Sequence, residues 1–600
     1  MVPEQMTAHA ARARALMAVA LGESPADLVV RGGTVLNVFT AELIQGCDVA
    51  VKAGRIAYVG PDAGHVVGPD TEIVEANGQF VVPGLIDGHT HVLETRYSLA
   101  ELLRYAVPGG TTTIITETGE LATVLGRRAV DALLDALVDQ PVKVFMTLPP
   151  LIGLAPFIEA HAPDLEAYER WLRHPRVLGL GEVYWGPLVR SDRRPLELVA
   201  ATVAAERRAE GHSAGARGSR LIAYAAAGIS SCHEPVTADE ARERLRLGLY
   251  TMVREGEIRQ DLAAMAPLWR DGTDLRRLVL VTDGQGPDRL LRLGYLDHCV
   301  RRAIELGLEP ARAIQMVTLN VAEHFGRDRD LGAVAPGRCA DLLLVPDLRD
   351  FRPTLVLSDG RVVARDGTLT VEPRQPSFPR HFYSTLKRPR IVRPADFAVP
   401  APDGGPIRAR AIELVTNLVT REEIIELRPV DGYLCADPKA DLVKIASLDR
   451  GRRTDELFVG FLRGYGLRRG AVATSMTWDS QSVIVIGADD RDMALAACRL
   501  LDTQGGVSVC AGGALVAEFE ARLGGLVSEA PLEEIASDLC TVEVALRELG
   551  CSSATPVLTA DTMTTGAIPH LRITDRGYVR LRDAAMLGLT ADSPSSVPRP

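Results

Sequence analysis

Short apolar runs alternate with amphipathic segments through the middle of the chain. Apolar runs that predict strands lie at residues 81–87, 111–116, 142–148, 178–184, 228–232, 249–253 and 277–282. Segments with the apolar spacing of helices lie between them, at 98–106, 128–138, 199–209, 238–247 and 309–324. This alternation is typical of a (β/α)8 barrel of the TIM type. One strand is poorly marked, because the run ERRAE at 206–210, just before His212, is strongly charged.

A different pattern flanks this region on both sides. Residues 27–37 predict a strand, a Gly32-Gly33 turn and a second strand, and residues 48–60 predict a hairpin that turns at 52–54. Similar strand and turn signals return at 331–345 and 356–363. We therefore expect a small β-sandwich domain built from both flanks of an inserted barrel.

A further unit follows a stretch rich in proline and arginine. Strands are predicted at 471–475 and 482–487 and a helix at 489–503, while an Ala-rich helix is predicted at 8–22, near the N-terminus. The expected fold is thus α/β, a barrel with a β-sandwich domain and a C-terminal α+β domain. The expected divisions are 1–80 for the first helix and the first part of the sandwich, 81–330 for the barrel, 331–370 for the second part of the sandwich, 371–405 for a linker, and 406–600 for the C-terminal domain.

Composition narrows the class of protein. The chain has 600 residues, of which 46% are hydrophobic and 24% charged, and its net charge of −11 argues against a role that depends on binding nucleic acid. The nine cysteines form no CxxC pair, and neither a signal peptide nor an apolar stretch of membrane-spanning length stands out. We expect a soluble cytoplasmic protein without a membrane or nucleic-acid partner.

The run VVPGLIDGHTH at 81–91 carries the first chemical signal. Residues i and i+2 of a strand point to the same side, so His89 and His91 can reach one metal ion at the C-terminal mouth of a barrel. An HxH pair alone is weak evidence, but its position directly after PGLIDG and a β unit makes a metal site the favoured interpretation over two ordinary strand-end histidines.

Further ligand candidates follow at the ends of later strands. Glu182 ends one apolar run, His212 and His233 occupy successive strand ends, and Asp283 ends the last strand, where it can bind metal and accept the proton of an attacking water. Six groups with nitrogen and oxygen ligands suit Zn, Mn or Fe rather than thiolate-seeking ions. Arg254 and Glu255 fit either a buried ion pair or substrate contacts.

These motifs resemble those of the amidohydrolase superfamily, and within it the bacterial adenine deaminase branch. The resemblance also rests on GGTTT at 109–113, ELATVLG at 120–126, AYAAAGI at 223–229, MVREG at 252–256, VGFLRGYGL at 459–467 and GGLVS at 524–528. It implies a binuclear centre, with Mn2+ or Fe2+ favoured and Zn2+ possible, and a homo-oligomer of two or more subunits. It places the metal ligands at His89, His91, Glu182, His212, His233 and Asp283, with Asp283 and Glu234 as the catalytic residues.

Two segments depart from the pattern of that branch. Residues 116–120 read TETGE where the family typically has Asp-Pro-His-Glu, and residues 476–482 read MTWDSQS where it has a His-Asp-Ser-His-Asn run. The residues expected to contact a small heterocyclic substrate are Glu94, Glu120, Trp478, Asp479 and Gln481. The resemblance implies deamination of adenine to hypoxanthine and ammonia. The departures leave open another purine or a cyclic amide or amidine as substrate, and a binding protein without catalysis is the third alternative.

Overall fold

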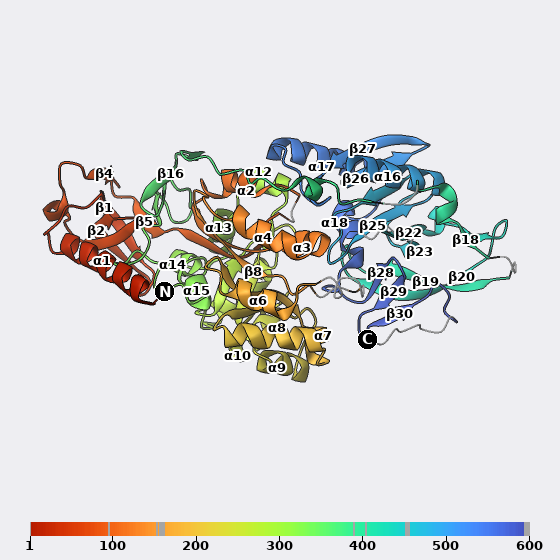
Figure 1. The fold of residues 1–600 in the computed structure, drawn as a ribbon, viewed down its shortest axis with the longest axis horizontal. Coiled ribbons are helices and arrows are strands. Elements are labelled where there is room, and N and C mark those ends of the chain that lie inside the picture. The colour runs from red at the N-terminus through yellow and green to blue at the C-terminus, as the bar shows by residue number, and fades with distance from the viewer. Residues whose placement is uncertain are drawn as a thin grey trace.

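The computed structural model describes residues 2–93, 96–151, 154, 162–387, 391–401, 405–450 and 457–592. Three regions follow one another along its long axis (Figure 1): a sheet near the N-terminus, a central unit of parallel strands and helices, and a C-terminal unit. In the part of the chain that the structure describes, no helix has the length and apolarity needed to cross a membrane.

The first region is one sheet of nine strands drawn from both flanks of the central unit. Its order is β17-β16-β15-β14-β5-β1-β2-β3, with β4 beside β1. Strand β5 joins the flanks, because it pairs parallel with β1 and antiparallel with β14. The elements are α1 (Val2–Ala20), β1 (Leu28–Asn37), β2 (Glu42–Lys52), β3 (Arg55–Gly60), β4 (Glu72–Glu75), β5 (Phe80–Pro83), β14 (Leu342–Val345), β15 (Leu355–Ser358), β16 (Arg361–Arg365) and β17 (Thr368–Leu369).

The turn expected at Gly32-Gly33 is wrong. Strand β1 runs through both glycines, and its register with β2 shifts between Val30 and Gly33, as in a β-bulge. Gly32 has a φ of 67° and its N–H donates to Oδ1 of Asp48 at 2.8 Å. A Cβ at Gly33 would lie 2.4 Å from Cγ2 of Val81, so these glycines serve a bulge and a close approach. The hairpin expected around 52–54 is confirmed by the pairing of Lys52 with Arg55.

The central unit contains eight parallel strands in two hydrogen-bonded ladders, β10-β9-β8-β7-β6 and β11-β12-β13. Backbone hydrogen bonds link the ladders at both seams, from Ser230 N to Ala209 O at 2.9 Å and from Asp283 N to His89 O at 3.1 Å. The strands are β6 (Leu85–His91), β7 (Thr111–Glu117), β8 (Lys143–Leu148), β9 (Val177–Tyr184), β10 (Arg208–His212), β11 (Ser231–Cys232), β12 (Tyr250–Arg254) and β13 (Leu278–Val281).

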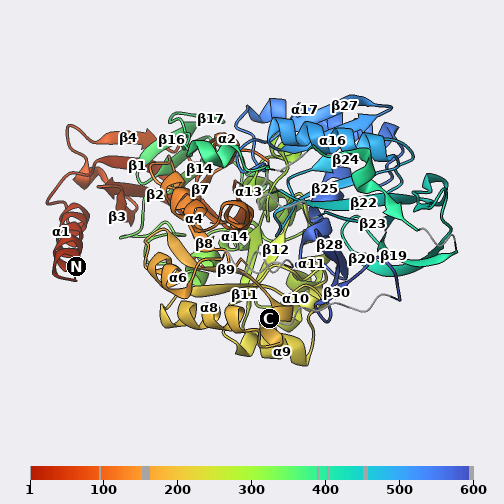
Figure 2. The same ribbon diagram turned by 45° about the vertical axis from the view of Figure 1, so that its right-hand side comes forward.

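Helices surround these strands, and α4, α6, α8 and α9 lie on the outside in Figure 2. The helices are α2 (Leu99–Ala106), α3 (Gly119–Leu125), α4 (Arg127–Ala136), α6 (Leu165–Leu172), α7 (Trp185–Val189), α8 (Arg193–Ala204), α9 (Ser219–Ala226), α10 (Ala238–Arg246), α11 (Leu262–Arg270), α12 (Pro287–Leu293), α13 (Leu296–Glu305), α14 (Pro310–Gln315) and α15 (Leu319–His324). The helix expected at 309–324 is therefore two helices, and the one expected at 199–209 ends at Ala204.

The poorly marked strand before His212 exists as β10. Its charged residue Glu210 is buried and satisfied: Ser231 donates to it at 2.5 Å, and Nε2 of His324 lies 2.8 Å from its carboxylate. A charged side chain is tolerated in a core when it is paired and hydrogen-bonded in this way. The charge of the run at 206–210 therefore hides a strand from its hydrophobic pattern.

The C-terminal unit is built on a sheet of order β20-β19-β23-β22-β25-β24-β26-β27, against which α16 and α17 pack. Its elements are β18 (Val399–Pro400), β19 (Ile407–Leu414), β20 (Thr420–Leu427), β21 (Tyr433–Leu434), β22 (Leu442–Asp449), β23 (Leu457–Arg463), β24 (Ala471–Thr474), β25 (Ser482–Gly487), α16 (Asp490–Thr503), β26 (Gly506–Ala511), β27 (Ala514–Glu520), α17 (Leu532–Glu548), α18 (Pro556–Asp561), β28 (Leu571–Thr574), β29 (Gly577–Arg580) and β30 (Ala585–Leu587).

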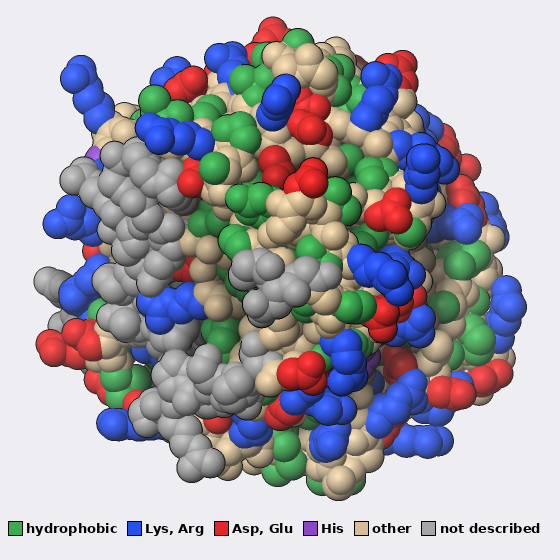
Figure 3. Space-filling model, turned by 90° about the vertical axis from the view of Figure 1, so that its right-hand side faces the viewer, with side chains coloured by type: hydrophobic (Ala, Val, Ile, Leu, Met, Phe, Trp, Pro, Cys, Tyr) green, Lys and Arg blue, Asp and Glu red, His purple; other side chains and the backbone are tan. Residues whose placement is uncertain are grey.

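The C-terminal unit shares its core with the central unit. Buried apolar side chains of both belong to one continuous cluster, whereas the sheet near the N-terminus also has a separate cluster of its own. The segment expected as a linker is anchored by the buried rings of Phe382 and Phe397. On the coloured part of the outer face of the C-terminal unit, basic and acidic side chains are intermixed (Figure 3). The shared core fixes this unit over the ends of the central strands.

Candidate metal centre

Five side chains converge at the carboxyl ends of the central strands. Oε1 of Glu182 lies 3.2 Å from Nε2 of both His89 and His233, and 3.4 Å from Nε2 of His91. Oδ1 of Asp283 lies 3.2 Å from Nε2 of His89 and 3.3 Å from Nε2 of His91. Ligand atoms of His89, Glu182, His233 and Asp283 all lie within 4.8 Å of one another, which is the compactness that a metal ion requires.

A second group adjoins the first and shares His233 with it. Oε1 of Glu234 lies 3.3 Å from Nε2 of His212 and 3.3 Å from Nε2 of His233, and the three ligand atoms lie within 4.8 Å of one another. Glu234 also pairs with Arg254. Two adjacent groups with a common histidine could hold two divalent cations.

The charges of the first group favour a cation there. Burial alone would raise the pKa values of Glu182 and Asp283, but the surrounding histidines hold both pKa values well below the usual range. Burial likewise opposes protonation of His89, yet its hydrogen bonds to Asp283 and Glu182 raise its pKa to about 10. The nitrogen and oxygen donors present therefore fit a divalent metal centre.

The backbone at Asp283 helps to aim its carboxylate. This residue has a φ of 53°, in the left-handed region, and its N–H donates to the carbonyl oxygen of His89 at 3.1 Å. Its other carboxylate oxygen, Oδ2, accepts from Arg254 at 3.4 Å. Arg254 also donates to Asp261 at 3.0 Å. Arg254 therefore pairs with Glu234, Asp261 and Asp283, and among the described residues it forms no ion pair with Glu255.

A buried carboxyl group that the sequence interpretation did not place in the site is Glu117, at the end of β7. It accepts a hydrogen bond from Thr147 at 2.7 Å, and a Cβ at Gly181 would lie 1.9 Å from its Oε2. Burial and the charge of Glu182 raise its pKa to about 8. Its position at the end of the second central strand is the signal in the sequence that could have found it.

The C-terminal unit reaches the mouth of the central strands through residues 478–481. The backbone N–H of Asp479 donates to both oxygens of Glu120, at 3.0 and 2.8 Å, and the amide of Gln481 donates to the carbonyl of Thr123 at 2.7 Å. Trp478 is held through its backbone, whose carbonyl accepts from Thr564 at 2.6 Å. Four of the five expected substrate contacts thus lie together at this junction, and the fifth, Glu94, lies outside the described residues.

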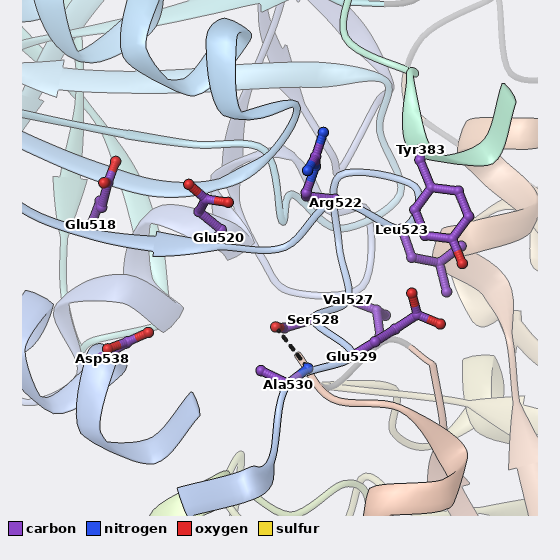
Figure 4. A pocket seen from close by; sticks show the side chains of 10 residues that line it. All are labelled: Tyr383, Glu518, Glu520, Arg522, Leu523, Val527, Ser528, Glu529, Ala530 and Asp538. Carbon is purple, nitrogen blue, oxygen red and sulfur yellow. Dashed lines mark hydrogen bonds between the residues drawn. The ribbon is translucent and has the colours of Figure 1, made fainter. Parts of the chain in front are cut away.

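A separate cavity of about 810 Å³ lies in the C-terminal unit (Figure 4). It is lined by Tyr383, Glu518, Glu520, Arg522, Leu523, Val527, Ser528, Glu529, Ala530 and Asp538. None of the candidate metal ligands lines it. Ser528 connects it to the junction, because its N–H donates to the carbonyl of Arg96 at 2.9 Å.

Comparison with known proteins agrees with this geometry. Residues 80–363 match the amidohydrolase family, and residues 417–585 match the adenine deaminase C-terminal domain. An adenine deaminase of Moorella thermoacetica is 40% identical over 586 residues, which cover 96% of this chain and 98% of the relative. The chain belongs to the adenine deaminase family. Adenine deaminase 3 of Rhizobium meliloti is 36% identical over 571 residues, covering 94% of this chain and 96% of that protein.

The amidohydrolase match identifies the central unit of this adenine deaminase family member as a TIM-type barrel domain. Among solved structures, a zinc-bound adenosine deaminase from Xanthomonas campestris is similar with a TM-score of 0.44 at 18% identity, covering 58% of this chain and 94% of that one. A β-aspartyl dipeptidase from Fervidobacterium islandicum has a TM-score of 0.45 at 20% identity, covering 57% and 97%.

Proposed function

We propose that this chain is a hydrolase of carbon–nitrogen bonds that converts adenine and water to hypoxanthine and ammonia. The observation that carries the proposal is the pair of ligand groups that share His233, with Asp283 between the histidines and Arg254. Its relatives at 36–40% identity over nearly their whole length are adenine deaminases. In the reaction the oxygen of water bonds to C6 of the base and the amino group leaves as ammonia.

The residues proposed to hold two divalent metal ions are His89, His91, Glu182, His212, His233 and Asp283. We favour Mn2+ or Fe2+ over Zn2+, as the family resemblance implies. When bound, such metals lower the pKa of water and so supply hydroxide near neutral pH. The carboxylate of Glu182 contacts Nε2 of His89, His91 and His233, so it would help to hold the metal ions together with these histidines.

Two acidic residues are proposed to handle protons. Asp283 would accept the proton of the attacking water, since its carboxylate faces the metal ligands, and the surrounding histidines together with Arg254 keep it charged against the effect of burial. Glu234 is also held ionised: burial opposes this, but Arg254 and His212 keep its pKa low. An ionised Glu234 would accept a hydrogen bond from the substrate and orient it.

We place substrate contacts at Glu94, Glu120, Trp478, Asp479 and Gln481, and the divisions of the chain at 1–80, 81–330, 331–370, 371–405 and 406–600. The central strands would close as a complete (β/α)8 barrel, and the sheet from both flanks would fold into a β-sandwich. We also propose a homo-oligomer that acts in purine metabolism in the cytoplasm. The nine free cysteines, all of which the structure describes, fit the reducing conditions of that compartment.

An ammonia-release assay tests the activity. Purified protein loaded with Mn2+ or Fe2+ is given adenine, other purines and a panel of cyclic amides and amidines. Ammonia and hypoxanthine from adenine are expected. No ammonia from adenine, together with consumption of another heterocycle, would transfer the proposal to that substrate.

Hydrolysis of another purine, or of a cyclic amide or amidine, is the second candidate, and a specific feature favours it. Glu120 and Gln481 form hydrogen bonds that join the barrel to the C-terminal unit. The segments TETGE and MTWDSQS also differ from the family pattern. A pocket with changed polar groups can shift substrate preference by orders of magnitude. Bound metal measured by elemental analysis separates both candidates from a protein that only binds, which needs no metal.

A further inference from the structure

Asp479 extends from the C-terminal unit to the end of β9 in the barrel. Its Oδ2 accepts two hydrogen bonds, from the hydroxyl of Tyr184 at 2.7 Å and from the hydroxyl of Thr565 at 2.5 Å. Among the described residues, none donates a hydrogen bond to its other oxygen, Oδ1, and the side chain is only partly buried. One oxygen is therefore fixed and the other is left to accept from a ligand.

This carboxylate lies one aromatic ring away from the candidate metal centre. Tyr184 follows Glu182 by two residues on β9, and its ring meets the ring of His212 edge-on, with 5.1 Å between centroids. Burial raises the pKa of Asp479. The charge of Glu182 raises this pKa further, whereas the charge of His212 lowers it. A planar ligand that reaches the metal ligands along Tyr184 would present its far edge to Asp479.

The surroundings hold Asp479 in a fixed position. Its φ is 53°, and its N–H is gripped by the carboxylate of Glu120. The loop that carries Thr565 is fastened by the buried guanidinium of Arg572, which donates to the carbonyls of Ile568 at 2.8 Å and Thr562 at 3.2 Å. A group held on all sides loses little freedom when it binds a ligand, so it can discriminate strongly.

We propose that Oδ1 of Asp479 accepts a hydrogen bond from the imidazole N–H of a free purine base and thereby selects bases over nucleosides and nucleotides. An ionised carboxylate has no proton to donate, so Oδ1 of the ionised Asp479 can only accept. A nucleoside has its sugar on N9 and no imidazole N–H in its neutral form, so Oδ1 would receive no hydrogen bond from it and would face the carbon atoms of the sugar. This inference rests on the proposed function.

The test compares adenine with 9-methyladenine, which keeps the amino-bearing ring but has no imidazole N–H. Metal-loaded wild-type protein is expected to favour adenine in kcat/KM by at least about a hundredfold, as sites that pair with a substrate N–H do. Asp479→Asn is expected to raise KM for adenine about tenfold or more with a smaller change in kcat and to shrink that preference at least about tenfold. The metal content is expected to stay the same, because Asp479 is not a metal ligand.

Asp502→Asn is the matched control, since Asp502 is an exposed aspartate near the end of α16 in the same unit. If Asp479→Asn does not fold, Thr565→Val tests the same carboxylate by removing one of its donors, and a weaker preference for adenine is again expected. Adenine turnover with an unchanged preference in these variants overturns the inference alone. No turnover of adenine by the wild-type protein overturns the proposed function and the inference with it.

Discussion

The guanidinium of Arg254 lies 3.4 Å from Oδ2 of Asp283, while Oδ1 of the same carboxylate lies 3.2 Å from Nε2 of His89. Asp283 is ionised, and one of its carboxylate oxygens faces Arg254 while the other faces His89. A carboxylate held in this way can take a proton from water without moving, since its backbone is tied to His89 as well.

Replacement of Asp283 by Asn is expected to abolish most of the turnover. Loss of a general base lowers rates by about two to four orders of magnitude, and loss of a metal ligand adds to this. The carboxamide has nearly the same shape, so the thermal unfolding midpoint should fall only modestly. Asp288→Asn on the exposed end of α12 is the control. Near-normal kcat in Asp283→Asn would remove this residue from proton transfer.

Substitution of Gly181 by Ala is expected to displace Glu117, because the new Cβ would lie 1.9 Å from Oε2 of that buried carboxyl group. Overpacking of this kind costs about 1–3 kcal/mol. We expect a lower free energy of unfolding and lower activity. The double variant with Glu117→Asp shortens the displaced side chain and should recover part of both. Wild-type stability in Gly181→Ala would show that Glu117 has room to move.

Asp561 should make stability fall as the pH rises. Burial raises the pKa of Asp561 to about 7. Its contact with Arg96 at 3.4 Å lowers the pKa only in part, since Arg96 lies closer to Glu257, at 2.9 Å, and the charge of Glu257 raises the pKa of Asp561. The folded protein therefore binds a proton more tightly than the unfolded chain. Its stabilising contribution is complete below about pH 4 and is lost as the pH rises through about 7.

Asp561→Asn removes this dependence. Thermal unfolding is measured at pH 5 and pH 8. The free energy of unfolding of the variant relative to the wild-type protein should be higher at pH 8 than at pH 5, by up to about a few kcal/mol. Asp538→Asn, at an exposed position of α17, should run parallel to the wild-type protein. A difference between Asp561→Asn and wild type that stays constant from pH 5 to pH 8 would contradict the raised pKa.

Trp478→His is expected to move substrate preference toward adenine, because it restores a histidine that the family resemblance places there. The backbone of Trp478 is held by Asp561 and Thr564, so the new side chain should keep the same direction. The measurement is kcat/KM for adenine against other purines. Trp478→Phe controls for the loss of the indole. An unchanged preference would place this side chain away from the substrate.

The hydrophobic pattern predicted those strands in which charged residues lie only at the ends. The strand that carries His89 and the strand that precedes Asp283 are examples. The pattern could not predict β10, because Glu210 is charged. The hydrogen bond that makes its burial possible comes from His324, which lies more than a hundred residues further along the chain. Glu117 and Tyr184 escaped the sequence interpretation for a related reason. Their neighbours, Gly181 and Asp479, are brought to them only by the folded barrel and by the docked C-terminal unit.

The pairing of β5 with β14 also bears on how the protein is made. Strand β5 leaves the ribosome with β1 as a partner on one edge, while its other edge must wait for Leu342–Val345. During that interval an apolar strand edge is open to pairing with other chains. Newly made protein should therefore be most prone to aggregate while the barrel is still being synthesised, and chaperones that shield strand edges should matter most then.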